Sequence, residues 1–423
     1  MNRLLPLMAA LLACVVVSPL AAATGPLPAT TPAAAGFSAE RLATLQHNLS
    51  AIVDAGKYSG YISLIARDGR VVDWQAHGWQ DIEAKTPMAK DSIVRIFSMS
   101  KIITSVGVLM LLEDGKLKLS DPVEKYLPAL KDRKVLAGGT ADAPVLVPAA
   151  RPITILDLLT HTAGYYYPES WSADAVPSEL MARARIFEAN GLDDFVNRVA
   201  QVPLHQQPGT RFRYGIHTDL LGAIIEKASG QRLDQFLQQR IFTPLGMPDT
   251  GFWVPAEKRS RLAKVYLRDA AGKLTPADSA NNNPTGPDRG VMGGGGGLYS
   301  TAADYGRFAQ MLLNGGELDG TRLLSRKAVE LMRQNHIAHL ADPHPFNRAE
   351  LGFGLGVRMV TDLGRSPTLG SPGMFGWDGA ATTIVWMDPQ ERTVIILLTQ
   401  HFPFNQDDIF ATFTNGCYSA LDN

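Results

Sequence analysis

The spacing of hydrophobic residues changes twice along the chain. After Ser38, a suitable helix N-cap, such residues recur every three or four positions, which predicts an amphipathic helix; they are Leu42, Leu45, Leu49, Ile52 and Val53. Two β-rich runs on either side of Asp68-Gly69 then predict a hairpin. Helical spacing dominates the middle of the chain, and strands return in "FGLGVRMV", "TTIVWMD" and "TVIILLTQ". The last run is apolar on both faces, which is typical of a central strand.

Two helices in the middle of the chain begin with the signature of a capping box, a threonine followed three positions later by an acidic residue. They are Thr154 with Asp157 and Thr301 with Asp304. Residues 131–150 and 335–350 show no periodicity and are predicted to be loops, whereas residues 407–420 are predicted to form a closing helix. We therefore expect an α+β fold. One antiparallel sheet is built from both chain ends and flanked by the terminal helices, with a large, mostly helical insertion.

The first residues are typical of an export signal. Arg3 is followed by an apolar run from Leu4 to Val17 and by Ala21-Ala22-Ala23, a small-residue cleavage site. Residues 1–23 are therefore predicted to be a signal peptide, which implies a periplasmic or secreted protein. A lipoprotein signal cleaved before Cys14 is the alternative. The apolar run is too short for a membrane span, and no later run is long enough.

The remaining chain is predicted to form one domain after a linker. Residues 24–36 are rich in proline, alanine and threonine, and we expect them to be poorly ordered. The domain would cover residues 37–420. Its sheet subdomain would comprise about 37–97 plus 350–420, and its helical subdomain about 98–349.

The composition is that of an ordinary globular protein, with 45% hydrophobic and 19% charged residues among 423. The formal net charge is −1 and no block of like charge occurs, so nothing favours a nucleic-acid partner. The nine histidines do not cluster with carboxylates, and we expect neither a metal nor another cofactor. Removal of the signal peptide would leave Cys417 without an intramolecular disulfide partner.

The stretch "VRIFSMSKIITSVGVLMLLEDGK", Val94 to Lys116, places a lysine in a helix that is hydrophobic in nearly every direction. Such a helix is buried in a core. Lys101 would lie in the first turn, where the helix dipole and burial both favour the neutral amine, which is a base. Ser98 shares its helix face, whereas Ser100 points away. Ser98 and Lys101 are thus a candidate nucleophile and its proton acceptor; an N-cap serine with a snorkelling lysine is the alternative.

Six segments, in this order, resemble the serine β-lactamase and penicillin-binding-protein superfamily; they are "SMSK", "LSDPVEKYLP", "ILDLLTHTAG", "PGTRFRYG", "GGGGGLYSTAADYGRFAQMLLNGG" and "FGWDGA". Within it, the chain is most similar to the family VIII carboxylesterases, which resemble class C β-lactamases. The similarity extends from about Phe37 to Gln400 and favours the catalytic interpretation of Ser98 and Lys101. No Gly-x-Ser-x-Gly motif offers a competing nucleophile.

The resemblance implies a third catalytic residue, Tyr214 in "FRYG", which matches the tyrosine of the family's Tyr-x-Asn-like motif. Its implied role is to exchange a proton with Ser98 and Lys101 and then to donate one to the leaving group. The asparagine position of that motif is Ile216 in this sequence. This departure is expected for esterase-like members and weakens any claim to the positioning of an amide or lactam.

A second departure is Trp377-Asp378-Gly379, where lactam-cleaving relatives have Lys-Thr-Gly on a strand lining the site. These three residues are the predicted substrate-binding residues. Trp377 cannot supply the cation that helps bind a substrate carboxylate and would instead offer a flat apolar wall. Carried over by position, the oxyanion hole would be the backbone N–H groups of Ser98 and Ala380, with Gly379 permitting close approach of the strand. The orientation of Asp378 is left open.

Gly293 to Gly297 are predicted to form a tight backbone passage near the site rather than a phosphate loop, because no Gly-Lys-Ser/Thr follows. Roles are left open for three histidines and an aromatic cluster; they are His161, His217, His401, and Tyr165-Tyr166-Tyr167 with Trp171. His161 is expected to hydrogen bond locally. The aromatic cluster would either line an acyl or alcohol pocket or pack in the core.

The sequence therefore predicts an exported serine hydrolase that cleaves small-molecule carboxylic esters through an acyl-enzyme on Ser98. One alternative keeps this site but uses it for β-lactam hydrolysis, D-amino-acid peptide cleavage or acyl transfer to an acceptor other than water. A second alternative, of another class, is a non-catalytic relative that binds cell-wall peptide. The presence of Ser98, Lys101 and Tyr214 argues against the latter.

Overall fold

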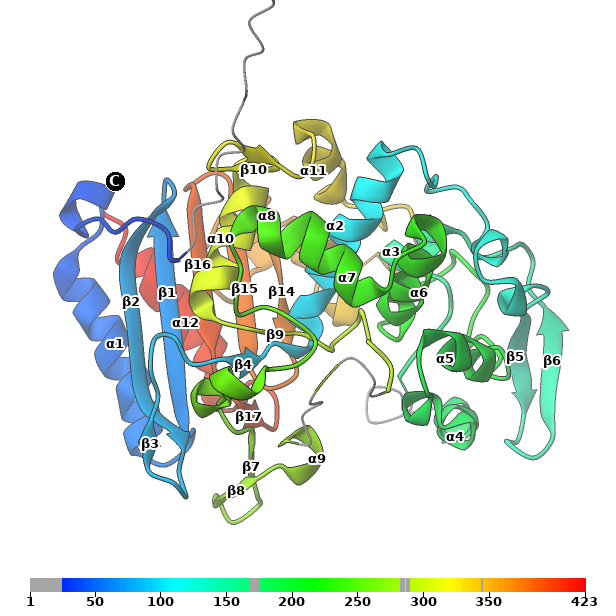
Figure 1. Cartoon of the computed structure of the whole chain (residues 1–423), viewed down its shortest axis with the longest axis horizontal. Helices are drawn as coiled ribbons and strands as arrows, with labels where there is room; N and C mark the ends of the chain where they lie inside the picture. Colours follow the sequence, from blue (N-terminus) through cyan, green and yellow to red (C-terminus); the bar gives the residue numbers. More distant parts are fainter. Residues whose placement is uncertain (1–24, 168–174, 282–285, 287–289, 344) are drawn as a thin grey trace, which may run out of the picture.

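The structure is a computed structural model and describes residues 25–167, 175–281, 286, 290–343 and 345–423. The predicted signal peptide, with Cys14, and Trp171 lie outside the described residues. Two parts lie side by side: a sheet with its covering helices, and a mostly helical part (Figure 1). No helix of the described residues is long and apolar enough to cross a membrane.

One eight-stranded antiparallel sheet is assembled from both ends of the chain. Its order is β12-β13-β14-β15-β16-β1-β2-β3. The strands are β1 (Gly60–Arg67), β2 (Arg70–Asp81), β3 (Thr86–Pro87), β12 (Leu351–Phe353), β13 (Arg358–Val360), β14 (Phe375–Gly379), β15 (Thr383–Asp388) and β16 (Thr393–Leu398). As its double-sided apolar pattern predicted, β16 is fully buried and lies between β15 and β1. The expected fold class is confirmed, and so is the hairpin at Asp68-Gly69.

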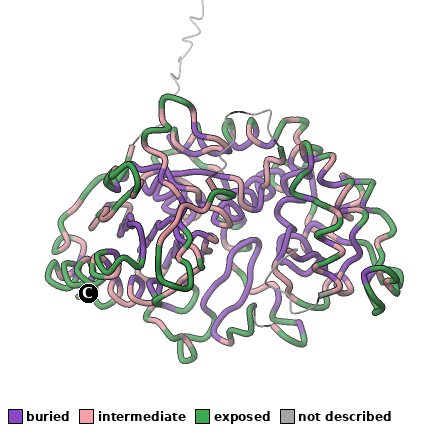
Figure 2. Tube along the Cα trace, turned by 90° about the horizontal axis from the view of Figure 1, so that it is seen from below, coloured by how far each residue is buried: buried purple, intermediate pink, exposed green. Residues whose placement is uncertain are grey.

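The two faces of this sheet bury different side chains. Ile62 and Leu64 of β1 pack in a core with α2 (Ser100–Glu113) and α10 (Ala302–Leu313). Tyr61 and Ile65, which alternate with them, pack in a second core with α1 (Ala39–Asp54) and α12 (Ile409–Ser419). The predicted first and last helices therefore cover one face together, and Figure 2 shows the buried trace concentrated between the outer, exposed segments. Lys101 lies in α2, on the opposite face of the sheet, and Ser98 lies in the turn directly before this helix.

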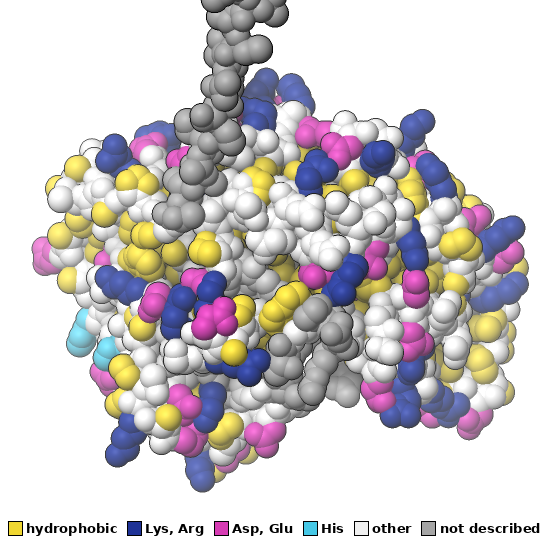
Figure 3. Space-filling model, in the orientation of Figure 1, with side chains coloured by type: hydrophobic (Ala, Val, Ile, Leu, Met, Phe, Trp, Pro, Cys, Tyr) yellow, Lys and Arg dark blue, Asp and Glu magenta, His cyan; other side chains and the backbone are white. Residues whose placement is uncertain are grey.

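The rest of the described chain comprises short helices and small strand pairs. The helices are α3 (Ile155–Leu159), α4 (Ala175–Ala184), α5 (Leu192–Val199), α6 (His217–Ser229), α7 (Leu233–Leu237), a π-helical turn (Gln238–Phe242), α8 (Thr243–Leu245), α9 (Asp278–Asn281) and α11 (Arg326–Met332). The strands are β4 (Val94–Arg95) with β9 (Tyr299–Ser300), β5 (Lys134–Gly139) with β6 (Pro144–Pro148), β10 (Glu317–Leu318) with β11 (Thr321–Arg322), and β7 (Tyr266–Arg268) with β8 (Leu274–Pro276) and β17 (His401–Phe402). Charges of both signs are interspersed over the face shown in Figure 3, in keeping with a net charge near zero.

Three local predictions are corrected by the structure. The segment 131–150 is not a loop but contains the β5–β6 hairpin, which extends from the helical part (Figure 1). Its apolar residues Val145 to Val147 are exposed, so no buried face imposes the alternation that reveals a strand. "FGLGVRMV" forms two strands, β12 and β13, because a turn at Gly356, with φ of +77°, reverses the chain.

The third correction concerns residues 25–36, which were expected to be poorly ordered. Leu27 is buried, and this segment runs beside β2, where Val71 donates its backbone N–H to Pro28 O and accepts a hydrogen bond from Thr30 N–H. Backbone pairing of this kind needs no side-chain periodicity, so the sequence pattern did not reveal it.

Of the two predicted capping boxes, one is complete. Thr154 and Asp157 bond each other's backbone at the start of α3, as predicted. At α10, Thr301 accepts a hydrogen bond from Asp304 N–H, but the Asp304 carboxylate accepts hydrogen bonds from Asp249 N–H and the Thr250 hydroxyl instead. The Asp304 carboxylate is thus engaged in tertiary hydrogen bonds and does not bond the backbone N–H of Thr301, as a complete capping box would require.

Candidate active site

The start of α2 brings a serine and a lysine together on a strained turn. Ser98 lies in a short 3₁₀ turn (Phe97–Met99) that leads into α2, and Phe97 has a φ of +44°. Left-handed backbone at a bulky residue is strained and concentrates at functional sites. Every residue of α2 from Ser100 to Leu111 is buried, as its all-round apolar pattern predicted, and Lys101 is 1% exposed. The Ser100 hydroxyl faces elsewhere, where it accepts a hydrogen bond from Leu298 N–H.

The Ser98 hydroxyl oxygen accepts two hydrogen bonds. Tyr214 donates its hydroxyl to Ser98 Oγ at 2.6 Å, and Lys101 donates from Nζ at 3.2 Å. The structure therefore places the three predicted catalytic residues within direct hydrogen-bonding distance, although Tyr214 is 116 positions away from Ser98. A serine oxygen between a phenol and an amine can lose its proton to either of them.

Lys101 has two further partners. Its Nζ donates to Gly295 O at 2.6 Å and to the Tyr167 hydroxyl at 3.0 Å. The Gly295 carbonyl can only accept, but both hydroxyl partners can either accept or donate. The same arrangement therefore accommodates an ammonium with three donors or a neutral amine whose lone pair faces one hydroxyl. The sequence revealed only the helix dipole and burial; these tertiary contacts also stabilise the charged form.

Asp219 is a site residue that the sequence pattern did not reveal. Its carboxylate accepts a hydrogen bond from Gly295 N–H at 2.9 Å, and its Oδ2 is buried without a hydrogen-bond partner among the described residues. Burial raises the pKa of Asp219, whereas the positive charge of Lys101 lowers it. Gly295 thus joins the two side chains, because Asp219 binds its N–H and Lys101 its carbonyl. The available signal was an acidic residue in the apolar first turn of α6, shortly after Tyr214.

The glycine run predicted to be a tight passage packs closely against this carboxylate. A Cβ atom added to Gly293 or Gly295 would overlap the Asp219 carboxylate. Gly297, at the end of the run, faces the ring of Phe252 in the same way. Side chains at these positions would push the backbone away from Lys101, which explains why the run consists of glycines.

Aromatic rings surround Tyr214. Ring centroids lie 5.0 Å away in His161, 5.4 Å in Trp377, 5.5 Å in Tyr167 and 5.7 Å in Phe346. Trp377 is 2% exposed, packs in the core and is not among the residues that line the cavity at Ser98, so its ring supports Tyr214 rather than forming the flat apolar wall predicted from the sequence. Because β14 passes beneath Tyr214, Trp377 influences the site through this tyrosine.

The end of β14 passes beside Ser98. A Cβ atom on Gly379 would overlap the carbonyl oxygen of Ile96, so this glycine permits the predicted close approach. The next residue, Ala380, lines the same cavity as Ser98, which is the placement an oxyanion hole built from these two residues requires. Asp378, whose orientation was left open, also lines the cavity and forms an ion pair with Arg358.

A cavity of about 490 Å³ is lined by Ser98, Tyr214, Asp219, Asp378 and the glycine run. Such a volume suits a small-molecule ligand. Tyr167 is the member of the predicted Tyr165-Tyr166-Tyr167 cluster that lines it, while Tyr165 and Tyr166 are buried in the core. Five further cavity residues, contributed by segments far apart in the chain, were not predicted from the sequence; they are Arg95, Phe97, Phe187, Val291 and Phe404.

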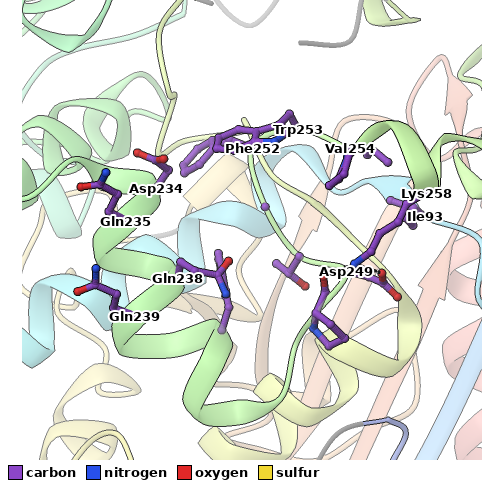
Figure 4. A pocket seen from close by; sticks show the side chains of 15 residues that line it. Ile93, Asp234, Gln235, Gln238, Gln239, Asp249, Phe252, Trp253, Val254 and Lys258 are labelled. Atoms are coloured by element: carbon purple, nitrogen blue, oxygen red, sulfur yellow. Dashed lines mark hydrogen bonds and ion pairs between the residues drawn. The ribbon is translucent and has the colours of Figure 1, made fainter. Parts of the chain in front are cut away.

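A second cavity, of about 340 Å³, lies between the α7 region and residues 248–258 (Figure 4). Gln235, Gln238 and Gln239 line it from the α7 region, and Phe252 and Trp253 line it from residues 248–258. Its lysine, Lys258, pairs with the Asp249 carboxylate at 2.9 Å. Because this lysine contacts a carboxylate rather than a serine hydroxyl, the Ser98 cavity is the candidate active site.

The three histidines are placed differently. His161 and His217 are buried, with their Nδ1 atoms 2.9 Å apart, so the side-chain hydrogen bond of His161 is made to a residue 56 positions away and not, as was expected, locally. The His401 ring packs against Tyr58 in a tilted arrangement, with ring centroids 3.9 Å apart, and His401 lies outside the residues that line the active-site cavity. Among the described residues, no group of three or more histidine, cysteine, aspartate or glutamate side chains is arranged to hold a metal ion.

Comparison with known proteins assigns the family. The model of the β-lactamase family matches residues 45–415, and the chain belongs to this family of serine hydrolases and acyltransferases. It is 35% identical over 365 residues to Protein Rv1367c of Mycobacterium tuberculosis, covering 85% of this chain and 90% of the relative. It is also 33% identical over 334 residues to the lovastatin esterase of Penicillium rubens, covering 72% and 80%.

A solved structure supports the same assignment. EstCE1, described as a hydrolase with promiscuous acyltransferase activity, superposes with a TM-score of 0.76 at 27% identity, covering 90% of this chain and 99% of EstCE1. The resemblance to the β-lactamase and penicillin-binding-protein superfamily, inferred from the motifs, is thereby confirmed.

Proposed function

We propose that the protein is an exported carboxylesterase that forms an acyl-enzyme on Ser98. The observation that carries the proposal is the position of Ser98 Oγ, which accepts hydrogen bonds from both Tyr214 and Lys101 in a cavity of about 490 Å³. Similarity to an esterase and to a hydrolase with acyltransferase activity supports this chemistry. Export rests on the sequence of residues 1–23 alone.

In the proposed mechanism, Ser98 Oγ attacks the ester carbonyl while its proton passes to Tyr214 or Lys101. The backbone N–H groups of Ser98 and Ala380 stabilise the negative charge that develops on the carbonyl oxygen. Tyr214 then donates a proton to the departing alcohol oxygen, and the carbon–oxygen bond to the alcohol breaks. Water attacks the acyl-enzyme, and its proton returns through the same pair of groups to Ser98.

Esters are favoured over β-lactams by the strand beside Ser98. Trp377 supplies no cation to bind a substrate carboxylate, and the Asp378 carboxylate at the cavity is already paired with Arg358. An uncharged ester does not need such a cation. Acyl transfer to an alcohol in place of water is the second candidate, because EstCE1 has promiscuous acyltransferase activity.

The test combines labelling and turnover. After reaction with a fluorophosphonate, mass spectrometry should locate the adduct on Ser98, and the protein should hydrolyse p-nitrophenyl butyrate. Ser98→Ala should abolish both, whereas Ser100→Ala should retain labelling. An adduct on Ser100, or a fully active Ser98→Ala variant, would contradict the proposal. Addition of a primary alcohol separates the two candidates, because a transferase yields the new ester in preference to the free acid.

A further inference from the structure

A buried pair of histidines joins the two chain segments that carry the active-site tyrosines. His161 lies in the turn after α3, six residues before Tyr167, and His217 begins α6, three residues after Tyr214. The Nδ1 atoms of the two rings are 2.9 Å apart. Both tyrosine hydroxyls that contact Ser98 or Lys101 therefore extend from segments joined by this one side-chain hydrogen bond.

The bond constrains the protonation of both rings. Because each ring contributes its Nδ1, one must carry a proton there while the other carries its proton on Nε2 and accepts. Burial lowers the pKa of His161 well below its ordinary range and that of His217 to about 3, and the positive charge of Lys101 acts in the same direction. Two neutral rings in opposite tautomers therefore form the bond at neutral pH.

Movement of His161 would be transmitted directly to Tyr214. The two rings pack with centroids 5.0 Å apart, and His161 O accepts a hydrogen bond from Arg213 N–H, the residue before Tyr214. His161 also has a φ of +55°, a strained conformation that surrounding contacts must maintain. The hydrogen bond to His217 is one such contact.

We propose that His161 and His217 form a positioning pair that keeps the Tyr214 hydroxyl directed at Ser98 and at the oxygen of the leaving alcohol. This inference rests on the proposed ester hydrolysis. In the acylation step the bond between Ser98 Oγ and the acyl carbon forms, the bond to the alcohol oxygen breaks, and the Tyr214 proton moves to that oxygen. An alkoxide is strongly basic and needs this proton, whereas p-nitrophenolate leaves readily without it.

The test compares two esters that share one acyl group. In His217→Leu, kcat/KM for ethyl butyrate should fall about tenfold more than kcat/KM for p-nitrophenyl butyrate, because small displacements of catalytic groups cost ten- to hundredfold in rate. Lower stability alone would reduce the active fraction and hence both values equally. An equal loss on the two esters, or no loss, would overturn the proposal.

Two variants separate positioning from stability. His217→Asn places an amide, which can donate or accept, near the position of Nδ1 and should restore most of the ethyl ester activity. His161→Leu/His217→Leu removes both polar partners, so its melting temperature should recover relative to His217→Leu, because no buried nitrogen is left unpaired. The selective loss on ethyl butyrate should nevertheless persist in this double variant. Recovery of that activity together with stability would show a purely structural pair and overturn the proposal.

Failure of the proposed function would be recognised separately. If the wild-type protein cleaved neither ester, ester hydrolysis would be contradicted. The pair would then be tested by the rate at which Ser98 is labelled by phosphonates that release either ethoxide or p-nitrophenoxide. In His217→Leu, the labelling rate with the reagent that releases ethoxide should fall more than that with the reagent that releases p-nitrophenoxide. Equal losses of the two labelling rates would overturn the positioning role of the histidine pair.

Discussion

Two cavities of this protein each have a lysine and an aspartate at or next to them, yet only the Ser98 cavity is arranged for proton transfer. In the Ser98 cavity, Lys101 contacts two hydroxyl groups and the Gly295 carbonyl, and the Asp219 carboxylate binds the N–H of that glycine. In the second cavity, Lys258 pairs directly with the Asp249 carboxylate. A carboxylate partner forms an ion pair, whereas a hydroxyl partner can both donate and accept a proton and can therefore take part in proton transfer. The partners of a lysine, rather than its presence in a cavity, indicate catalysis.

The largest expected effect is that of removing proton transfer at Lys101. Arginine keeps the charge but cannot give up its proton, so Lys101→Arg should lower kcat for p-nitrophenyl butyrate by about 10³-fold. The matched change Lys258→Arg keeps an ion pair in the other cavity and should leave kcat unchanged. Steady-state kinetics of both variants provide the measurement. Substantial activity in Lys101→Arg would mean that this lysine, like Lys258, is a structural cation.

A smaller effect is expected in substrate selectivity. Trp377 stands where lactam-cleaving relatives have a lysine that binds the substrate carboxylate, and such a charged hydrogen bond is worth about 1.5–3 kcal/mol. The kcat/KM of the wild-type protein for p-nitrophenyl butyrate should therefore exceed that for carboxylate-bearing penicillins or cephalosporins by about ten- to hundredfold. Comparable values for both substrate classes would favour the β-lactamase alternative.

The two buried aspartates should differ in their effect on activity. Asp219→Asn keeps an acceptor for Gly295 N–H but removes the charge near Lys101, and kcat/KM should fall by about tenfold. Asp304→Asn, under the second cavity, should leave kcat/KM unchanged because Asp304 contacts Asp249 and Thr250 instead. Equal activities of the two variants would show that Asp219 acts only in folding.

The smallest effect concerns the pH dependence of stability. Burial raises the pKa of Asp304 to about 7, so the folded protein holds this proton more tightly than the unfolded chain. The stabilisation is complete below the unfolded pKa, about 3.9, and is lost as the pH rises through about 7. The melting temperature of the wild-type protein should therefore fall by a few degrees more between pH 5 and pH 8 than that of Asp304→Asn. Parallel melting curves across this range would contradict the expectation.

Local patterns predicted the elements around the site well. Ser98 and Lys101 are three positions apart, and this spacing alone predicts that their side chains share one face of a helical turn. The burial of α2 follows from its all-round apolar surface. The hairpin at Asp68-Gly69 and the central place of β16 also follow from short sequence patterns. The β5–β6 hairpin was missed because Val135 is its only buried strand residue, so no alternation marks its strands.

The sequence by itself determined the buried α2 helix, the Ser98–Lys101 pair and, through family resemblance, Tyr214. Only the tertiary structure decided that Tyr167 and Gly295, 66 and 194 positions from Lys101, complete its contacts, and that Asp219 holds the same glycine. It also placed Trp377 beneath Tyr214 rather than at the cavity surface. The physical reason is the range of each interaction. A helical turn fixes neighbours three positions apart, whereas contacts between distant segments form only when the sheet and helices bury their apolar faces together.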